Sequence, residues 1–394
     1  MKTCVVIVDG MNDLPIKQFR GTPLEKARTY AMDAIASQEM GCIKLFDFAP
    51  ESDEAMMALL NLKPEKNYPG RGILEAYGAG FRLEADAIYF RCNIAKVEGK
   101  KIVDFEASMD EKLKKGIEKI VNGIDIGLDF EFKFTKGHRA VLIFKDKAKK
   151  LSDKVSNTNP AYKTKAGSKL SIALPRPEGK DYFILSSKPL EKTSAAAFTA
   201  SKLNEFTEKT LQALRQRGLN FGILVRGASR LGKWSEEIKR IAKKRGFEGW
   251  ALISEMPVEI AIAKLLGMKI YKYPKSYQKL VELIVKLLKR KSVYVQIKGP
   301  DAYAHRGDFV GKAKSIEEID ANFLMPLIKK LQEQGIEVEL IVGCDHVTSS
   351  KHRSHYRGNV TYAKAKLPAF LKPKTKFCER LCRKKKKIIK HLPI

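Results

Sequence analysis

Short apolar runs alternate with helical stretches through the second half of the chain, and this alternation constrains the fold more than any other feature. Four apolar runs have the length of buried strands: residues 221–225, 250–253, 293–297 and 338–342. Four helical stretches lie between or beside them: residues 235–245, 257–266, 277–289 and 316–334. Strands that are apolar throughout are typical of a mostly parallel sheet with helices on both faces. Residues 4–8 form a similar run, so the two ends of the chain are predicted to share one α/β domain.

The middle of the chain has a different pattern of residues. A glycine-rich passage begins near Tyr68, and a loop-rich stretch covers 149–180. Alternating strands are predicted between them, at 87–97, 101–105, 130–134 and 140–144. We therefore predict a smaller α+β domain inserted into the core. The expected extents are 1–68 and 211–370 for the core, 69–210 for the insertion and 371–394 for a frayed basic C-terminal extension.

Composition is that of a globular protein. The chain has 394 residues, of which 44% are hydrophobic and 30% charged, and its length suits two domains. No apolar run is long enough to cross a bilayer, and the N-terminal run is too short for a signal peptide. Six cysteines in a chain of this length do not make a disulfide framework. These features lead us to expect a cytoplasmic protein without membrane contact.

The net charge of +30 bears on the partners of the protein. Basic surfaces attract anionic substrates and bind nucleic-acid backbones through counterion release. The lysines are spread along the whole chain, and only residues 383–387 form a dense basic run. That run lacks the interleaved aromatic residues of single-strand binders. We interpret the charge as substrate attraction, with non-specific nucleic-acid binding through the tail as an open alternative.

Acids and histidines gather after the predicted strands. Three acids follow apolar runs: Asp9, Asp301 and Asp345. Three of the six histidines lie near them in sequence: His305, His346 and His355. The carboxyl ends of parallel strands meet at one edge of a sheet, where ligands bind. Each residue alone is more often a turn former or a hydrogen-bonded surface group, but together they predict a site for zinc, manganese or magnesium. Ser52 is either a helix N-cap or a hydroxyl ligand in that site.

Several motifs resemble those of archaeal-type cofactor-independent phosphoglycerate mutases, which belong to the alkaline-phosphatase superfamily. The most distinctive are Val8-Asp9-Gly10-Met11-Asn12-Asp13, Pro50-Glu51-Ser52-Asp53, Phe90-Arg91-Cys92-Asn93, Lys298-Gly299-Pro300-Asp301 and Asp345-His346. Others lie at 70–72, 75–80, 151–153, 226–228 and 305–309. The resemblance covers residues 1 to about 360. It implies a phosphatase-like α/β core with an inserted domain that helps to hold substrate.

The resemblance also implies a site and an activity. Two divalent cations (manganese, magnesium, cobalt or zinc) would be bound, one by Asp9, Ser52, Asp345 and His346 and the other by Asp301, His305 and His355. Ser52 would be the nucleophile, forming a phosphoserine intermediate while 3-phosphoglycerate and 2-phosphoglycerate interconvert, as in glycolysis and gluconeogenesis, without bisphosphoglycerate. Candidate substrate-binding residues in the inserted domain are Arg91, Asn93, His138 and Arg139.

Two departures from the family pattern concern residues that are expected to surround the substrate. Met56 stands where the family usually has histidine, and residues 104–108 read Asp-Phe-Glu-Ala-Ser where the family tends to have arginines. Fewer arginines and more acids disfavour a small dianionic substrate. Two alternatives to the mutase therefore stay open. One is a related phosphatase or phosphotransferase that acts on a different phosphate ester, and the other is a nucleic-acid-binding protein on the same fold.

Overall fold

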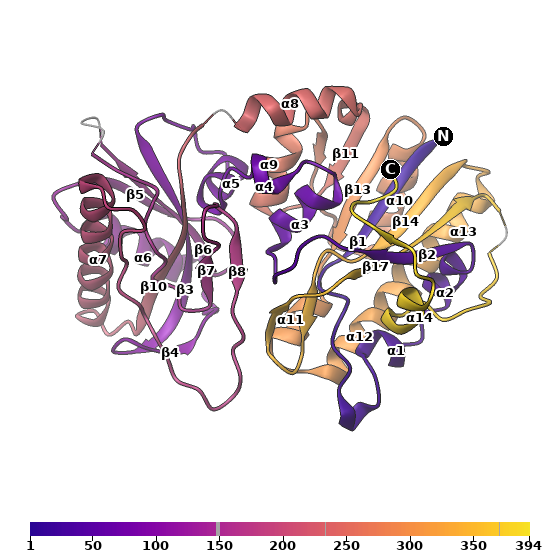
Figure 1. Ribbon diagram of the computed structural model, residues 1–394, viewed down its shortest axis with the longest axis horizontal. Coiled ribbons are helices and arrows are strands. Elements are labelled where there is room, and N and C mark those ends of the chain that lie inside the picture. The colour runs from indigo at the N-terminus through magenta and orange to yellow at the C-terminus, as the bar shows by residue number, and fades with distance from the viewer. Residues whose placement is uncertain (147–149, 233, 370) are drawn as a thin grey trace.

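The computed structural model describes residues 1–146, 150–232, 234–369 and 371–394, and its largest feature is a mixed sheet (Figure 1). In this described part of the chain the sheet has eight strands. In spatial order they are β12 (Lys269–Tyr271), β11 (Trp250–Ile253), β13 (Ser292–Ile297), β1 (Lys2–Val8), β14 (Val338–Gly343), β17 (Val360–Leu367), β2 (Glu39–Ile43) and β18 (Ile388–Ile389). The pairs from β12 to β14 are parallel, and β17 runs antiparallel to both of its neighbours.

The centre of this sheet is covered on both faces. Every residue from Cys4 to Val8 in β1 is fully buried, and alternate residues of a strand point to opposite faces. Helices therefore pack on both sides, as the uniformly apolar strands predict. The helices of this domain are α1 (Pro23–Lys26), α2 (Tyr30–Ala36), α3 (Ser52–Leu59), α4 (Pro64–Asn67), α8 (Trp234–Lys244), α9 (Pro257–Leu265), α10 (Tyr277–Leu288), α11 (Pro300–His305), α12 (Phe309–Ile319), α13 (Met325–Glu333) and α14 (Glu379–Lys384). Helix α5 (Arg71–Gly78) lies between α9 and the second sheet described below.

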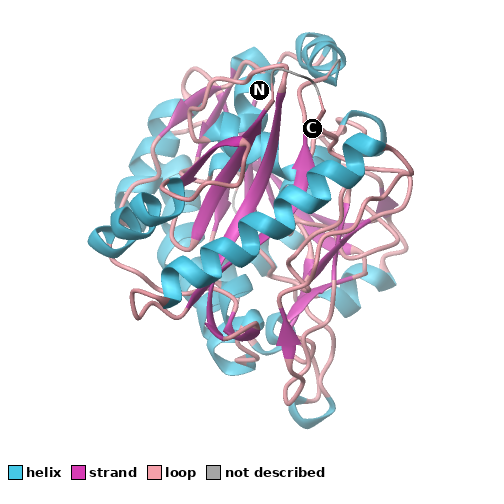
Figure 2. Ribbon diagram, turned by 90° about the vertical axis from the view of Figure 1, so that its left-hand side faces the viewer, coloured by secondary structure: helices cyan, strands magenta, loops and turns pink. Residues whose placement is uncertain are grey.

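The middle of the chain forms a second, antiparallel sheet beside the first (Figure 1). Its strands are β5 (Asp129–Phe134), β6 (Arg139–Lys145), β3 (Ala87–Glu98), β4 (Lys101–Asp104), β9 (Tyr182–Phe183) and β10 (Phe221–Ser229). Two helices, α6 (Glu111–Asn122) and α7 (Ser194–Arg215), enclose an apolar core with it. Figure 2 shows the long helix α7 lying across the strands. Two hairpins complete the fold: β7 (Tyr162–Thr164) with β8 (Ser171–Ala173), and β15 (Val347–Ser349) with β16 (Ser354–Tyr356).

The position of β10 corrects one prediction. The apolar run at 221–225 was expected among the strands of the parallel sheet, but it pairs antiparallel with β3 in the second sheet. It is buried because α7 and α5 both contact it. A strand buried on both faces has the same apolar pattern in either sheet, so the pattern does not decide its partner. The exact extents of the two domains otherwise stay a prediction.

The C-terminal segment is packed rather than frayed, which corrects a second prediction. Strand β18 pairs parallel with β2, and α14 contacts β2 and β17. Six of its side chains are buried: Leu371, Phe377, Cys378, Glu379, Cys382 and Leu392. The basic run 383–387 stays exposed. The sequence does not predict this packing, because the few apolar residues that dock the segment lie among many lysines. Among the described helices, none is long and apolar enough to cross a membrane.

Candidate metal and phosphotransfer site

Three neighbouring strands carry the predicted acids to one edge of the large sheet. Strand β1 lies between β13 and β14, in parallel with both. Asp9 follows β1, Asp345 lies two residues after β14, and Asp301 lies in α11 after β13. Because parallel strands end at the same edge, these carboxylates meet there. The sheet topology therefore brings together residues that lie about 300 positions apart in the sequence.

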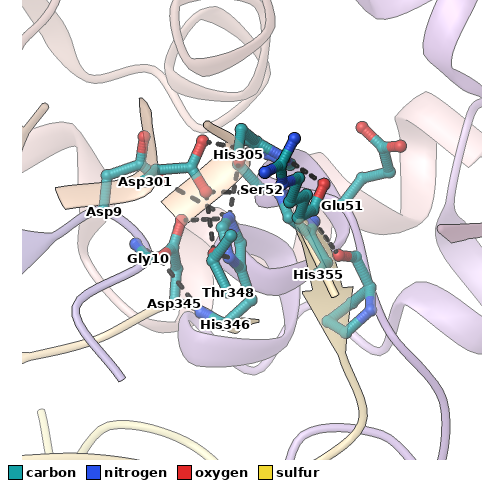
Figure 3. Close-up of polar contacts among 12 residues, drawn as sticks. Asp9, Gly10, Glu51, Ser52, Asp301, His305, Asp345, His346, Thr348 and His355 are labelled. Atoms are coloured by element: carbon teal, nitrogen blue, oxygen red, sulfur yellow. Dashed lines mark hydrogen bonds and ion pairs between the residues drawn. The ribbon is translucent and has the colours of Figure 1, made fainter. Parts of the chain in front are cut away.

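Asp9, Asp345 and His346 form a first cluster (Figure 3), in which one ligand atom from each residue lies within 4.8 Å of the others. His346 Nε2 is 3.4 Å from Asp9 Oδ1 and 3.3 Å from Asp345 Oδ2. Gly10 N donates to Asp345 Oδ1 at 3.0 Å. Only glycine suits this position, because φ is +59° and a Cβ atom would lie 2.7 Å from Asp301 Oδ1.

Asp301, His305 and His355 form a second cluster of the same kind. Nε2 of His305 is 3.4 Å from one oxygen of Asp301, and Nε2 of His355 is 3.5 Å from the other. The rings of His346 and His355 stack with their centroids 3.7 Å apart, so the two clusters adjoin. His352, three residues before His355, stacks on Tyr356 and belongs to neither cluster.

The hydrogen bonds of two of the three histidines determine which ring nitrogen carries the proton. His355 Nδ1 lies 2.7 Å from Pro50 O, and His305 Nδ1 lies 3.1 Å from Arg353 O. A carbonyl oxygen only accepts, so His355 Nδ1 donates, whereas His305 Nδ1 also lies 3.0 Å from the donor Arg176 Nη2 and these two contacts favour opposite tautomers. Thr348 Oγ1 donates to Asp301 at 2.7 Å and therefore accepts from His346 Nδ1 at 2.9 Å. His346 and His355 thus present the lone pair of Nε2 to the carboxylates.

This arrangement fits divalent cations. Lone pairs of nitrogen and carboxylate oxygens repel one another unless a positive charge lies between them. Imidazole nitrogens held by a second hydrogen bond, together with carboxylates, are ordinary ligands of zinc and manganese. Without a cation, burial and the adjacent carboxylate of Asp9 raise the pKa of Asp345 well above its usual value. The donor set therefore supports the predicted use of divalent metal.

Ser52 lies at the first cluster. Its Oγ is 3.1 Å from His346 Nε2, which accepts the hydroxyl proton in this tautomer. The N-cap alternative for Ser52 is wrong, because Glu51 is the N-cap of α3 and Ser52 is the first helical residue. Glu54 accepts a hydrogen bond from Glu51 N at 3.1 Å and supports that turn. The Ser52 hydroxyl is therefore free for chemistry.

A cavity of about 300 Å³ opens onto both clusters and is lined by residues of both sheets. The four candidate substrate-binding residues all line it: Arg91, Asn93, His138 and Arg139. Arg91 forms a buried ion pair with Glu75 at 2.7 Å. Burial lowers the pKa of His138 to about 4, so this imidazole is neutral at pH 7. Asn93 Oδ1 is buried without a hydrogen-bond partner in the described structure and is free to accept one.

Sequence reasoning missed several residues that shape the site. Lys298 Nζ lies 3.0 Å from Asp9 Oδ2 and 2.9 Å from Glu259 Oε1. Gln296 Nε2 donates to Asp345 at 2.7 Å and to Asp9 at 3.2 Å. Lys298 belongs to a motif that the sequence offers, whereas Gln296 is one polar residue inside an apolar strand. The signal for Gln296 is visible in the sequence, because a glutamine buried in an apolar strand needs hydrogen-bond partners.

Met56, which departs from the family pattern, is fully buried in the core of the large sheet and does not line the cavity. Of the other departure, residues 104–108, Asp104, Phe105 and Glu106 line an adjoining cavity, and Glu106 lines this one as well. The position of Met56 is consistent with a role in packing rather than in substrate contact.

Comparisons with known proteins agree with this geometry. A family model described as 2,3-bisphosphoglycerate-independent phosphoglycerate mutase matches residues 41–220, and one described as the Metalloenzyme superfamily matches 236–380. The phosphoglycerate mutase of that name from Aeropyrum pernix is 32% identical, over 88% of this chain and 87% of the relative. The chain belongs to this family. The corresponding protein from Methanopyrus kandleri is 31% identical, over 88% of this chain and 83% of the relative.

Solved structures share the fold of this family member. The PH0037 protein from Pyrococcus horikoshii has a TM-score of 0.65 at 23% identity and covers 97% of this chain and 92% of its own. A cofactor-independent phosphoglycerate mutase from Thermoplasma acidophilum has a TM-score of 0.53 at 20% identity. The match covers 99% of this chain and 97% of that protein. The predicted family and fold class are confirmed.

Proposed function

We propose that this protein interconverts 3-phosphoglycerate and 2-phosphoglycerate through a phosphorylated Ser52, with no need for bisphosphoglycerate. Its relatives are named for the bisphosphoglycerate-independent mutase activity. The single observation that supports the proposal most is the Ser52 hydroxyl at 3.1 Å from His346 Nε2, in a cavity lined by both clusters. Such an enzyme of central metabolism would act on a small phosphorylated substrate in the cytoplasm.

Two sets of residues would hold the divalent cations. One set is Asp9, Ser52, Asp345 and His346, and the other is Asp301, His305 and His355. When bound, the cations supply positive charge that favours the Ser52 alkoxide and stabilises the transferring phosphoryl group. Oxygen and imidazole donors accept manganese, magnesium, cobalt and zinc alike.

The chain's own residues carry the transfer. A bond forms between Ser52 Oγ and phosphorus as the bond from phosphorus to the glycerate oxygen breaks. Ser52 loses its hydroxyl proton and the departing glycerate oxygen gains one, so the step involves no net gain or loss of protons. The glycerate then presents its other hydroxyl, and the phosphoryl group returns to it by the reverse of the first step. Lys298, whose pKa is raised by Asp9 and Glu259 against the effect of burial, stays cationic beside the site.

Retention of the glycerate between the two steps separates a mutase from a phosphatase. Residues from the second sheet form one wall of the cavity, which reduces the access of water. Arg139 lines it and makes no ion pair within the described residues, so its guanidinium is available for a carboxylate or phosphate. Asn93 Oδ1 offers an acceptor for a glycerate hydroxyl. These two residues are proposed to hold the intermediate glycerate.

A second candidate function is hydrolysis or transfer of phosphate on another ester. It is favoured by the acidic residues at the cavity in which the substrate would bind. Glu51 and Glu75 neutralise arginines that line the cavity, and Glu106 lies at its edge. A cavity of this kind attracts a dianion less strongly than one with unpaired arginines. Nucleic-acid binding through the exposed run 383–387 also stays a prediction, and it would weaken steeply with salt.

The test is an activity assay of the manganese-loaded protein without added bisphosphoglycerate. Conversion of 3-phosphoglycerate to 2-phosphoglycerate, with no release of inorganic phosphate, would support the mutase. Release of phosphate from phenyl phosphate without any mutase turnover would support the second candidate. The Ser52→Ala protein is the blank for both assays, because it lacks the nucleophile and keeps the clusters.

A further inference from the structure

A second cavity of about 610 Å³ adjoins the first one. The two share three lining residues: Glu106, Ala302 and His305. One wall comes from the turn after β4, and another comes from the segment that follows β8. A molecule at the two metal clusters thus has open space beyond His305. We call the two spaces the inner and the outer cavity.

The segment after β8, residues 174–180, is a strap from the second sheet that is fixed to the first domain. Arg176 N donates to His352 O at 3.0 Å, and Glu178 pairs with Arg353 at 2.7 Å. Just before the strap, Ala173 N donates to Ala49 O at 3.2 Å. These contacts hold the strap beside the hairpin that carries His355. Its side chains therefore have a defined position relative to the site.

Arg176 is the strap residue that reaches the boundary of the two cavities. Its Nη2 donates to Arg353 O at 3.2 Å and lies 3.0 Å from His305 Nδ1. The guanidinium stacks on the ring of Phe105, with 4.8 Å to the ring centroid. No carboxylate lies within ion-pair distance of Arg176 among the described residues. A partly buried, oriented guanidinium with unused N–H donors is suited to a carboxylate or phosphate.

The inner cavity contrasts with this arrangement. Three of its arginines already have buried acidic partners: Arg226 with Glu51, Arg91 with Glu75, and Arg71 with Glu51 and Asp53. Replacing such a partner with a substrate anion would leave the displaced carboxylate buried and unpaired, which is costly. These three arginines are therefore poor sites for a further anionic group, which leaves Arg139 as the available guanidinium among the arginines that line the inner cavity.

We propose that the outer cavity is the subsite for the anionic group of the substrate that is not transferred, and that Arg176 binds it. The preferred substrates are then small phosphate esters that carry a second anionic group, such as a carboxylate, at some distance from the ester. This subsite rests on the proposed function, because it orients the substrate of the Ser52 reaction. Phe105 fixes the plane of the guanidinium, and the strap fixes its position.

The test compares two esters that differ only in the second anionic group. Binding of 3-phosphoglycerate and of glycerol 3-phosphate to the manganese-loaded Ser52→Ala protein is measured by titration calorimetry, with and without Arg176→Ala. We expect Arg176→Ala to weaken phosphoglycerate binding about tenfold, the scale of one hydrogen bond between charged groups, and to weaken glycerol phosphate binding much less. Arg176→Lys should recover only part of the loss. Equal weakening for both esters, or none for phosphoglycerate, would overturn the subsite.

A matched control separates a specific contact from diffuse charge. Arg306 lines the same cavity, is exposed, and stacks on Tyr303 at 4.9 Å. Arg306→Ala removes the same charge, and we expect no change in the affinity for either ester. A loss equal to that of Arg176→Ala would overturn the role of Arg176. Failure of the Ser52→Ala protein to bind either ester would instead refute the proposed function itself, whatever Arg176 does.

Discussion

Both carboxylate oxygens of Glu51 accept hydrogen bonds from one guanidinium, that of Arg226, at 3.0 and 3.1 Å. Glu51 directly precedes Ser52 at the start of α3, whereas Arg226 lies on β10 in the second sheet. Both side chains are almost completely buried, and the Arg226 guanidinium stacks on Tyr162 at 3.8 Å. A buried ion pair therefore joins the two domains immediately beside the proposed nucleophile.

Removal of Glu51 should be strongly destabilising. Glu51→Ala leaves two arginines, Arg226 and Arg71, without this buried partner. Breaking a buried ion pair from one side costs about 3–5 kcal/mol. Urea unfolding would measure the change in the free energy of unfolding. Glu237→Ala is the control, since its pair with Arg240 is exposed and its loss should be undetectable. Equal midpoints for the two variants would contradict the prediction.

Ser52→Ala should abolish turnover and leave thermal stability nearly unchanged. The hydroxyl makes no capping bond in α3, so its loss does not weaken the helix. Incubation of the wild-type protein with substrate should add one phosphoryl group that mass spectrometry assigns to Ser52. Full activity of Ser52→Ala would show that the phosphoserine mechanism is wrong.

Chelation should inactivate the protein and lower its melting temperature. Without a cation, the carboxylates of Asp9 and Asp345 adjoin one another in a buried site. Ligands that bind only the folded state stabilise it by mass action, so added manganese should restore the melting temperature in proportion to the logarithm of its concentration. Differential scanning fluorimetry with and without chelator measures this. The same melting temperature in both conditions would argue against metal at these clusters.

Asp320 should make stability depend on pH. Its carboxylate accepts from Ala31 N and Met32 N at the start of α2, and burial raises its pKa from 3.8 to about 6. A raised pKa means that the folded state binds the proton more tightly, so the stabilisation is complete below 3.8 and is lost as pH rises through about 6. Relative to Asp320→Asn, the wild-type free energy of unfolding should fall by about 2 kcal/mol from pH 4 to pH 7. Chemical denaturation at several pH values tests this, and a flat difference would refute it.

The C-terminal segment should stabilise the loop that follows Asp9. Glu379 in α14 accepts from Asp13 N at 3.0 Å and from Thr22 Oγ1 at 2.7 Å. Glu379→Ala leaves these buried donors unsatisfied, and we expect it to lower the free energy of unfolding by about 2 kcal/mol. Glu337→Ala, an exposed change of the same kind, should have little effect in the same unfolding experiment. If both variants match the wild type, the segment is not a support for this loop.

Much of the site was predictable because its signals are local. Asp9, Asp301 and Asp345 each follow an apolar run, and the end of a strand is fixed by a few neighbouring residues. Parallel pairing then brings strand ends together without further information. The histidines were visible because they are rare in this chain and lie near those acids. The roles assigned to these residues stay proposals.

Other features needed contacts between distant segments. The partner of β10 is set by α5 and α7 packing around it, and the apolar run of five residues at 221–225 does not indicate to which sheet the strand belongs. The docking of α14 depends on a few buried side chains among many lysines.

The sequence by itself determined the α/β alternation, the family and the set of acids and histidines, because each depends on residue type and short-range order. Only the tertiary structure decided which histidine nitrogen faces the carboxylates, since partners such as Pro50 O lie about 300 residues away. It also decided that Glu51 forms an ion pair with Arg226, whereas the Arg176 guanidinium keeps free N–H donors. Charge balance in a cavity is a property of packing, and no local pattern of residues encodes it.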